Sequence, residues 1–293
     1  MLHKSCPVLA LSVALAGAAD SPAPNPLDTI RAGTYSHSSA SLHNARLLNW
    51  NIDRGKHLDG ILATIRESKP DLCIFQEVDL GARRTQGMDV AEELAKKTGM
   101  NYAFAPEFEE LSQSTHEGAA YHGQATLTIM PIRSSRILRF AHQSGFWKPN
   151  HLLMSSLSIW QRREGGRIAL VTELDNGGKM LVVYNLHLES RGSEQGRLLQ
   201  LNEVLADAER YAPETPVIVA GDLNTKIRTS PVIPRLKEAG YRSAFGDHKV
   251  RTHIIIGALD WIFARGPIQF DDPHVYPEAH ASDHFPISVE AKF

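Results

Sequence analysis

Pro216-Val217-Ile218-Val219-Ala220-Gly221-Asp222-Leu223-Asn224 is an apolar run that ends in a carboxylate and an amide. The run is typical of a buried strand, so the polar pair lies where the chain leaves the predicted sheet. Similar polar clusters beside apolar runs are Asn49-Trp50-Asn51-Ile52-Asp53, Gln76-Glu77-Val78, Asn185-Leu186-His187-Leu188-Glu189, Leu259-Asp260-Trp261-Ile262-Phe263 and Ser282-Asp283-His284. Such groups are costly to desolvate unless a cation or a reacting group compensates them. The pattern therefore indicates a hydrolase that uses a hard divalent metal.

Composition sets broad limits on the fold and the partner. The chain has 293 residues, of which 42% are hydrophobic and 22% charged, which fits one large α/β domain or two small ones with a sizeable core. The formal net charge of −2 gives no global attraction to nucleic acid or to anionic lipid, although a local basic patch remains compatible with it. Charge therefore leaves the partner undecided.

The N-terminal residues resemble a targeting segment. A weakly basic start, a short apolar stretch and small residues at 16–18 predict a signal peptide over residues 1–19, with an uncleaved anchor or a disordered tail as alternatives. Residues 20–45, rich in proline and serine, are expected to be a flexible lead-in to a domain over 46–293. The protein is thus expected to be exported, either periplasmic or secreted. After cleavage only Cys73 remains, in an apolar run, and it cannot form an internal disulfide.

The pattern from Arg46 onward alternates between strands and helices. Helices are predicted around Leu58–Ser68, near Val90–Ala95 and over Ser193–Arg210. Strands are predicted at 47–52, 72–75, 102–105, 125–129, 135–140, 154–160, 168–174, 180–186, 217–220, 259–263 and 287–291. Asp175-Asn176-Gly177-Gly178 predicts a hairpin. Two half-sets of strands with helices outside them predict an α/β fold in which two sheets pack face to face under helices.

Oxygen ligands gather near the first two strands. Asn51 and Asp53 point to one side of their strand, and together with Glu77 they would suit Mg²⁺, which binds a few carboxylates and keeps several waters. Zinc fits less well, because no pair of histidines stands at close helical spacing. Taken alone, a carboxylate at a strand end such as Glu77 is more often simply solvated.

Two histidines are candidates for catalysis. His284 follows Asp283, and an imidazole oriented by a carboxylate can act as a general base or, when protonated, neutralise phosphate charge. His187 ends another apolar run. Asp222 can accept a proton from water and Asn224 can orient a phosphoryl oxygen, although this short motif alone is equally compatible with a turn. Other histidines in polar loops are expected to be solvated or to make minor substrate contacts: His116, His122, His142, His151 and His280.

Taken in order, the six polar clusters resemble the endonuclease/exonuclease/phosphatase superfamily, which is deoxyribonuclease I-like. The resemblance covers about Arg46 to Phe293; each motif alone is weak, but all six in order are specific. It implies a four-layered α/β sandwich, two packed mixed β-sheets flanked by helices, and cleavage of phosphoester bonds with Mg²⁺ or, alternatively, Mn²⁺.

The resemblance also implies roles for individual residues. Glu77 would be the principal metal ligand with Asn51 and Asp53 beside it, and Asp283 would help to hold the metal or its waters. Asp222 would align or deprotonate the attacking water, and Asn224 would hold the phosphate. His187 would donate to a phosphate oxygen. His284 would be the acid or base oriented by Asp260, and whether Asp222 or His284 is the true base stays open.

Substrate contacts are less well defined by the sequence. Arg83 and Arg84 could clamp a phosphate, although a solvated pair is the simpler interpretation. Gln124 stands where the family often has an asparagine, so a substrate contact there is expected to be altered rather than lost.

The function predicted from these observations is an exported, divalent-metal-dependent phosphodiester hydrolase with nuclease-like activity, acting as a monomer without a stable membrane span. The substrate class stays open between nucleic acid, phospholipid and small phosphate esters. The alternatives are a lipid-headgroup phosphodiesterase (sphingomyelinase-like), a phosphomonoesterase and a non-catalytic phosphate-binding relative.

Overall fold

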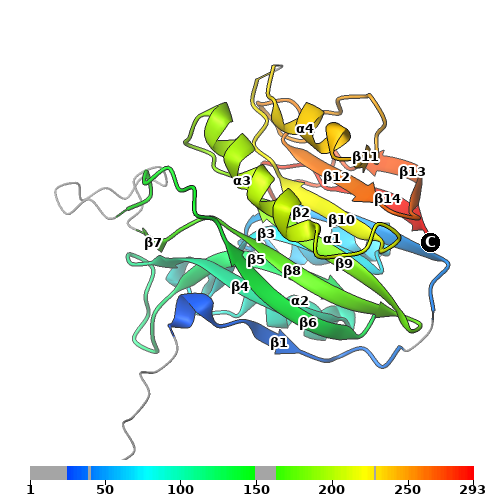
Figure 1. Cartoon of the computed structure of the whole chain (residues 1–293). Helices are drawn as coiled ribbons and strands as arrows, with labels where there is room; N and C mark the ends of the chain where they lie inside the picture. The colour runs from blue at the N-terminus through cyan, green and yellow to red at the C-terminus, as the bar shows by residue number, and fades with distance from the viewer. Residues whose placement is uncertain (1–24, 39–40, 149–162, 228) are drawn as a thin grey trace, which may run out of the picture.

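The computed structural model describes residues 25–38, 41–148, 163–227 and 229–293, and their strands form two mixed sheets (Figure 1). The first sheet has the order β1-β4-β5-β3-β2-β14-β13, with β7 paired to β4, and the second has the order β11-β12-β10-β9-β8-β6. The strands of the first sheet are β1 (Arg31–Gly33), β2 (Asn44–Arg54), β3 (Leu72–Leu80), β4 (Asn101–Glu110), β5 (Tyr121–Thr128), β7 (Arg163–Gly165), β13 (Gln269–Val275) and β14 (Ile287–Lys292). The strands of the second are β6 (Ile132–Arg139), β8 (Ile168–Asn176), β9 (Lys179–His187), β10 (Val217–Asp222), β11 (Arg242–Ser243) and β12 (Asp260–Arg265).

Helices cover the outer face of each sheet. The helices are α1 (Leu58–Ser68), α2 (Val90–Thr98), α3 (Glu194–Ala208) and α4 (Val232–Glu238), with short 3₁₀ turns η1 (Pro26–Asp28) and η2 (Arg83–Thr85). Helices α1 and α2 pack on the first sheet, and α3 and α4 on the second, as separate apolar clusters show. A third cluster fills the space between the sheets. The fold is therefore the four-layered α/β sandwich that the sequence predicts.

Alternation along β2 explains how one strand serves two cores. Leu48 and Trp50 belong to the cluster under α1 and α2, whereas Leu47 belongs to the cluster between the sheets. Successive side chains of a strand point to opposite faces, so a strand buried on both sides is apolar almost throughout. Near the end of β2 and β3 the inner face becomes polar: Gln76 Nε2 donates to Asn49 Oδ1 at 3.0 Å and to Asn185 Oδ1 at 2.8 Å. These bonds join the two sheets just below the strand ends.

Several predicted elements are confirmed. Helix α1 has the predicted bounds, and α3 begins after Ser193, whose hydroxyl accepts from Gly196 N at 3.0 Å. The predicted hairpin joins β8 to β9. Cys73 is a free thiol, fully buried in β3.

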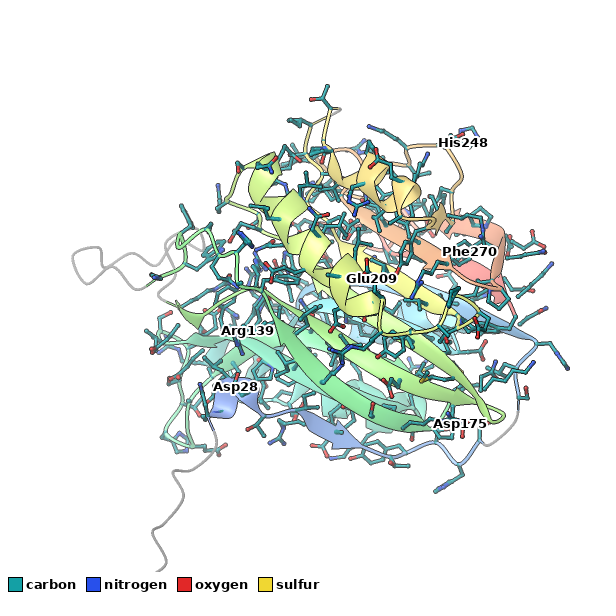
Figure 2. The ribbon with its side chains drawn as sticks, viewed as in Figure 1. Asp28, Arg139, Asp175, Glu209, His248 and Phe270 are labelled. Carbon is teal, nitrogen blue, oxygen red and sulfur yellow. The ribbon has the colours of Figure 1, made fainter. Side chains whose placement is uncertain are left out.

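Two short elements lie within the segment 20–45 that the sequence predicts to be a lead-in. Strand β1 lies within it and pairs with β4, and the nearby η1 is tied to β6 because Arg139 Nη2 donates to Leu27 O at 2.6 Å and to Asp28 Oδ1 at 3.2 Å (Figure 2). A strand of only three residues is too short to show a periodicity in the sequence. Helix α4 and strand β13 are also absent from the prediction. The predicted strand at 154–160 and the predicted signal peptide lie outside the described residues.

None of the helices formed by the described residues is long and apolar enough to cross a membrane.

Strand pairing brings the polar clusters to one end of the sandwich. Strand β10 lies parallel to β9 and antiparallel to β12, which places Asp222 opposite both His187 and Asp260. Strand β14 pairs with β2, so His284, just before β14, lies near Trp50, and Trp50 Nε1 donates to His284 O at 2.8 Å. The site is thus assembled by the pairing of strands that lie far apart in the sequence.

Candidate active site

Asp222 lies at the centre of the site. Its Oδ2 atom lies 3.5 Å from His187 Nε2, 3.8 Å from His284 Nε2 and 3.4 Å from Asn51 Nδ2, and its Oδ1 atom accepts from Asn224 N at 2.9 Å. Asp222 is 2% exposed. The carboxylate is therefore held by neighbours on two different sheets.

Glycine at 221 is what lets β10 reach this position. A Cβ atom there would lie 1.9 Å from Leu186 O on the neighbouring strand, and the φ angle of +147° is one that residues with side chains rarely adopt. Close approach of β10 and β9 thus fixes the distance between Asp222 and His187.

Each ring nitrogen of His284 faces a carboxylate. Nδ1 lies 2.8 Å from Asp260 Oδ2, while Nε2 faces Asp222. The main chain is fixed as well, because Ser282 Oγ donates to Asn51 O at 2.7 Å and accepts from His284 N at 3.1 Å. The ring orientation is thus set before any substrate arrives.

Protonation of this group follows from burial and charge. Burial disfavours an imidazolium, but the carboxylates of Asp260 and Asp222 outweigh it and raise the pKa of His284 to about 10. Burial also raises the pKa of Asp222 to about 7, against the effect of the His284 charge. Near neutral pH the proton therefore resides on His284, and Asp222 is close to its own titration point.

His187 has the opposite character. Burial, followed by the nearby positive charge of Arg167, lowers the pKa of His187 well below its usual value, so the ring is neutral. Its Nδ1 atom is buried and has no hydrogen-bond partner among the described residues. Asp260 Oδ1 is buried and unpartnered in the same way. Buried polar atoms without partners are rare and point to a bound group.

Asp53 and Glu77 converge on one point. Arg54 Nη1 lies 2.9 Å from Glu77 Oε2 and also contacts Asp53 Oδ1, and Lys56 Nζ lies 3.1 Å from Asp53 Oδ2. Burial opposes ionisation of Glu77, yet Arg54, together with His122 and His187, lowers the pKa of its carboxyl well below its usual value. A permanent negative charge is therefore maintained at this point and is balanced by a guanidinium.

Unusual backbone conformations aim these side chains. Asp53, Arg54, Glu77 and Asn224 all have positive φ, at 41°, 71°, 52° and 51°. The register of β2 and β3 shifts at the same residues, as expected of bulges. Left-handed backbone in residues with side chains is uncommon and is concentrated at functional sites.

The residues suit a divalent cation. Asp53 and Glu77 offer carboxylate oxygens, the donors that Mg²⁺ prefers, and the point where they converge already holds a positive charge on Arg54. Among the described residues, two further groups have ligand atoms within 4.8 Å of one another: Asp222, Asp260 and His284, and His253, Asp283 and His284. The structure therefore offers candidate metal positions at Asp53 and Glu77 and at the two groups that contain His284.

The structure brings together most of the predicted site residues but not all. Asp283 is 54% exposed at its side chain and lies 3.5 Å from His253 Nε2, in a group separate from Asp53 and Glu77. Thr252, the residue before His253, accepts from Leu259 N and Asp260 N, both at 3.0 Å, and so fixes the start of β12.

The three predicted substrate contacts are placed differently from the prediction. Gln124 is fully buried, and its amide accepts from Leu170 N at 3.0 Å and donates to Ile168 O at 3.1 Å, so it links β5 to β8. Arg84 makes two 2.7 Å contacts with buried Asp79, and Arg83 donates to Ser112 O. Each of these three side chains therefore already has a hydrogen-bond partner within the protein.

Other residues of the site were missed by the sequence analysis. His122 was expected to be solvated, but it is buried in β5 at 3.3 Å from Asp79. His253 lies against His284 with ring centroids 4.8 Å apart, and Arg54 and Arg167 supply buried positive charge. The adjacency of Arg54 to Asp53 was the only available signal, because the others depend on tertiary pairing.

Comparison with known proteins agrees with this geometry. Residues 48–284 match the model of the Endonuclease/Exonuclease/phosphatase family. The chain belongs to this family. No similarity to a curated protein reaches significance.

Solved structures of the same family share the fold. An endonuclease/exonuclease/phosphatase from Beutenbergia cavernae is 19% identical with a TM-score of 0.65, over 86% of this chain and 72% of that one. The human Nocturnin catalytic domain with bound sulfate is 18% identical with a TM-score of 0.65, over 87% and 96%. Humanized D. rerio TDP2 is 19% identical with a TM-score of 0.60, over 86% and 100%. At these identities the likeness establishes the fold, which is that of the family's phosphoesterases.

Proposed function

We propose that the protein is an exported, Mg²⁺-dependent phosphodiester hydrolase with nuclease-like activity. The observation that carries this proposal is the position of Asp222 between His187 and His284, with Asp260 behind His284. In-line attack on phosphorus demands mainly positioning of the nucleophile and neutralisation of charge, and this arrangement supports both.

Asp222 is assigned as the residue that aligns and deprotonates the attacking water. Its pKa of about 7 suits a general base near neutral pH, whereas His284 already carries a proton there. His284, oriented by Asp260, is assigned as the donor to a phosphoryl oxygen. This division of roles is our proposal for the choice that the sequence left open.

His187 and Asn224 are assigned to the phosphate. His187 Nε2, which lies 3.5 Å from Asp222 Oδ2, carries the proton of the neutral ring in this proposal and donates it to a phosphate oxygen. Asn224 Nδ2 donates to Leu188 O at 3.0 Å, which holds the amide beside Asp222 with its second hydrogen free to contact the substrate.

The metal is assigned to Asp53 and Glu77, with Asn51 beside them, whereas Asp283 lies in a separate group with His253 and His284. When bound, the ion supplies charge neutralisation for the phosphoryl group. The residues of this chain keep Glu77 ionised and its carboxylate aimed through the bulge in β3.

The second candidate, a lipid-headgroup phosphodiesterase, is favoured by one observation. Ile254 and Ile255 are 46% and 83% exposed on the loop that carries His253, directly beside His284. Exposed isoleucines at the mouth of a site are suited to contact with a lipid surface.

Nicking of supercoiled plasmid by purified protein in Mg²⁺, with His284→Ala run beside it, tests the proposal. Nicking by the wild type alone is the expected result. If neither protein nicks the plasmid but the wild type releases headgroups from phospholipid vesicles, the second candidate replaces the first. Turnover by His284→Ala at the wild-type rate on either substrate contradicts the assigned site, and absence of turnover on both would favour the phosphomonoesterase or the non-catalytic alternative.

A further inference from the structure

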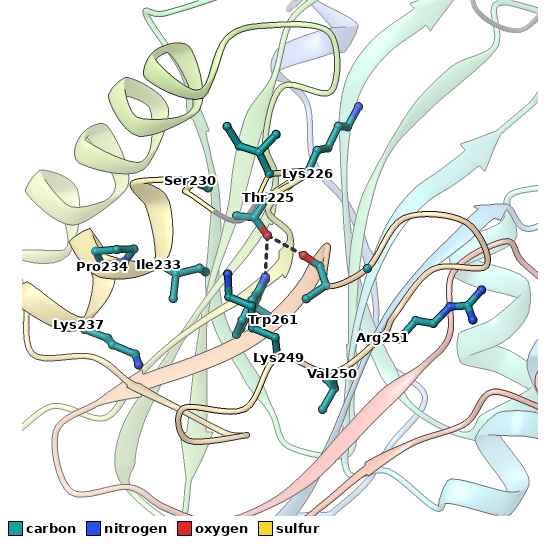
Figure 3. Close-up of a pocket in the computed structure, with 13 residues that line it drawn as sticks. Thr225, Lys226, Ser230, Ile233, Pro234, Lys237, Lys249, Val250, Arg251 and Trp261 are labelled. Carbon is teal, nitrogen blue, oxygen red and sulfur yellow. Dashed lines mark hydrogen bonds between the residues drawn. The ribbon is translucent and has the colours of Figure 1, made fainter.

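A separate cavity of about 560 Å³ lies next to the candidate active site (Figure 3). It lies between α4, the loop that follows Asn224 and the segment leading into β12. Its volume is within the range of small-molecule sites. Nothing in the assigned mechanism uses it.

Basic residues line this cavity beside apolar ones such as Ile233 and Trp261. Four of the lining residues are cationic, and none of the described residues that line it is acidic. These cations are Lys226, Lys237, Lys249 and Arg251. The chain as a whole has a formal net charge of −2, so the concentration of positive charge is a local property of this cavity. Gathering like charges raises the free energy of the fold unless an anion compensates them.

The cations of this cavity differ in how they are bound, and Lys226 is engaged outside it, because its Nζ atom donates to Ser190 O at 2.6 Å. Lys237 pairs with Asp247, whose side chain is 95% exposed, so this ion pair is weak and easily exchanged. Arg251 Nε donates to His253 O at 3.0 Å, which holds the guanidinium at the wall without neutralising its charge.

A buried hydroxyl also lines the cavity without a partner. Ser230 is 6% exposed, and its Oγ atom has no hydrogen bond to any described residue. A buried hydroxyl that forms no bond costs free energy, so its presence beside four cations indicates a ligand with acceptor oxygens.

The wall shared with the catalytic site is rigid. Trp261 Nε1 donates to Thr225 Oγ1 at 2.9 Å, and Thr225 Oγ1 donates to Ala258 O at 2.7 Å, as drawn in Figure 3. Thr225 follows Asn224 directly and Trp261 follows Asp260, so the cavity and the catalytic site use two sides of the same loop and strand.

We infer that this cavity binds a second phosphate group. That phosphate is either the next phosphate of the same substrate chain or a separate phosphate ligand. The first source rests on the proposed phosphodiesterase function, whereas phosphate binding itself does not depend on it.

The binding test uses the full chain in a chelator, with inorganic pyrophosphate as the probe and isothermal titration as the measurement. Replacing Lys237 and Lys249 together by alanine is expected to weaken binding at least about tenfold, because hydrogen bonds to charged groups contribute this much or more. Lys97→Ala is the matched control: Lys97 and Lys237 are 44% and 43% exposed, and each forms one surface ion pair. Lys97→Ala should leave binding unchanged.

Equal binding by the wild type and the Lys237→Ala/Lys249→Ala variant overturns the inference, as does absence of binding by the wild type. The His284→Ala variant, titrated in parallel, should retain the binding that the double variant loses. These results are independent of turnover, so they stand whether or not the proposed activity is found.

The source of the phosphate is distinguished with two dithymidine substrates, one with and one without a 5′-terminal phosphate. If the double variant loses kcat/KM only on the phosphorylated dinucleotide, the second phosphate belongs to the substrate. An equal loss on both, with pyrophosphate binding impaired, assigns the cavity to a separate phosphate ligand.

Discussion

His284 Nδ1 lies 2.8 Å from Asp260 Oδ2, and this contact does most to give His284 its charge. Burial alone would favour the neutral ring. The same histidine faces Asp222 through Nε2, so one imidazolium separates two buried carboxylates that would otherwise repel each other. The contact between Asp260 and His284 explains why His284 keeps its proton at a pH at which Asp222 has lost its own.

The pH dependence of kcat/KM should show the titration of both Asp222 and His284. In the proposed mechanism, activity requires Asp222 as a carboxylate and His284 as an imidazolium, with pKa values of about 7 and about 10. We expect kcat/KM to fall about tenfold per pH unit below 7, as Asp222 gains a proton, and to fall above 10, as His284 loses one. Asp260→Asn removes the largest upward influence on the pKa of His284, so the alkaline limb should move to lower pH. An alkaline limb at the same pH in both proteins would contradict this account.

Asp222→Asn should lower kcat by about 10²–10⁴-fold while the fold is retained, because the amide keeps the size but cannot accept the proton. Single-turnover rates and circular dichroism of the two proteins measure this directly. A variant that retains more than a tenth of the rate would show that another group takes the proton.

Chelation should abolish turnover, and Mg²⁺ should restore it, if Asp53 and Glu77 hold the ion. Arg54→Ala adds a readout that does not depend on turnover. In chelator it leaves two carboxylates without their guanidinium and should destabilise the fold by about 2–3 kcal/mol. Added Mg²⁺ should then raise the Tm of Arg54→Ala more than that of the wild type. Equal Tm shifts in the two proteins would place the metal elsewhere.

Gln124→Leu should lower the stability of the protein without changing substrate binding. The substitution removes the partners of Leu170 N and Ile168 O between the sheets, which should cost about 2–4 kcal/mol. Urea unfolding measures the loss, and KM at a temperature where the variant is folded should match the wild type. A raised KM with unchanged stability would restore Gln124 as a substrate contact.

Gly221→Ala should be more damaging than its size suggests. The added methyl group would overlap Leu186 O, so β10 must move away from β9, at a cost of about 3 kcal/mol or more. The variant should also lose activity in proportion to the displacement of Asp222 from His187. Wild-type stability in urea would mean that the strands can separate without cost.

The sequence was sufficient for the strands, the helices and the central residues of the site. Alternating and continuous apolar runs predicted β2, β3, β9 and β10, because burial on both faces leaves few polar positions. It was insufficient where a role depends on a partner far along the chain. Gln124 was predicted as a substrate contact, and His122 as solvated or a minor substrate contact, because the residues that bury them lie far away in the sequence.

Backbone conformation was the other hidden property. Glu77 was predicted as a ligand from its place after a strand, but the left-handed turn that aims it, and the Arg54 guanidinium that balances it, come from bulges in two paired strands. Residue types alone do not encode a register shift of this kind. The exposed isoleucines beside His284 were likewise unexpected, since a short apolar run is equally typical of a buried strand.

The hydrogen bond from Trp50 to His284 spans 234 positions of the chain. Contacts of such long range can form only after the intervening chain has been ordered, and proteins dominated by them fold slowly. The placement of His284 therefore depends on one of the long-range pairings of the fold. In the proposed mechanism, a chain in which β14 is not paired to β2 lacks His284 at its place beside Asp222 and is inactive until the sheet closes.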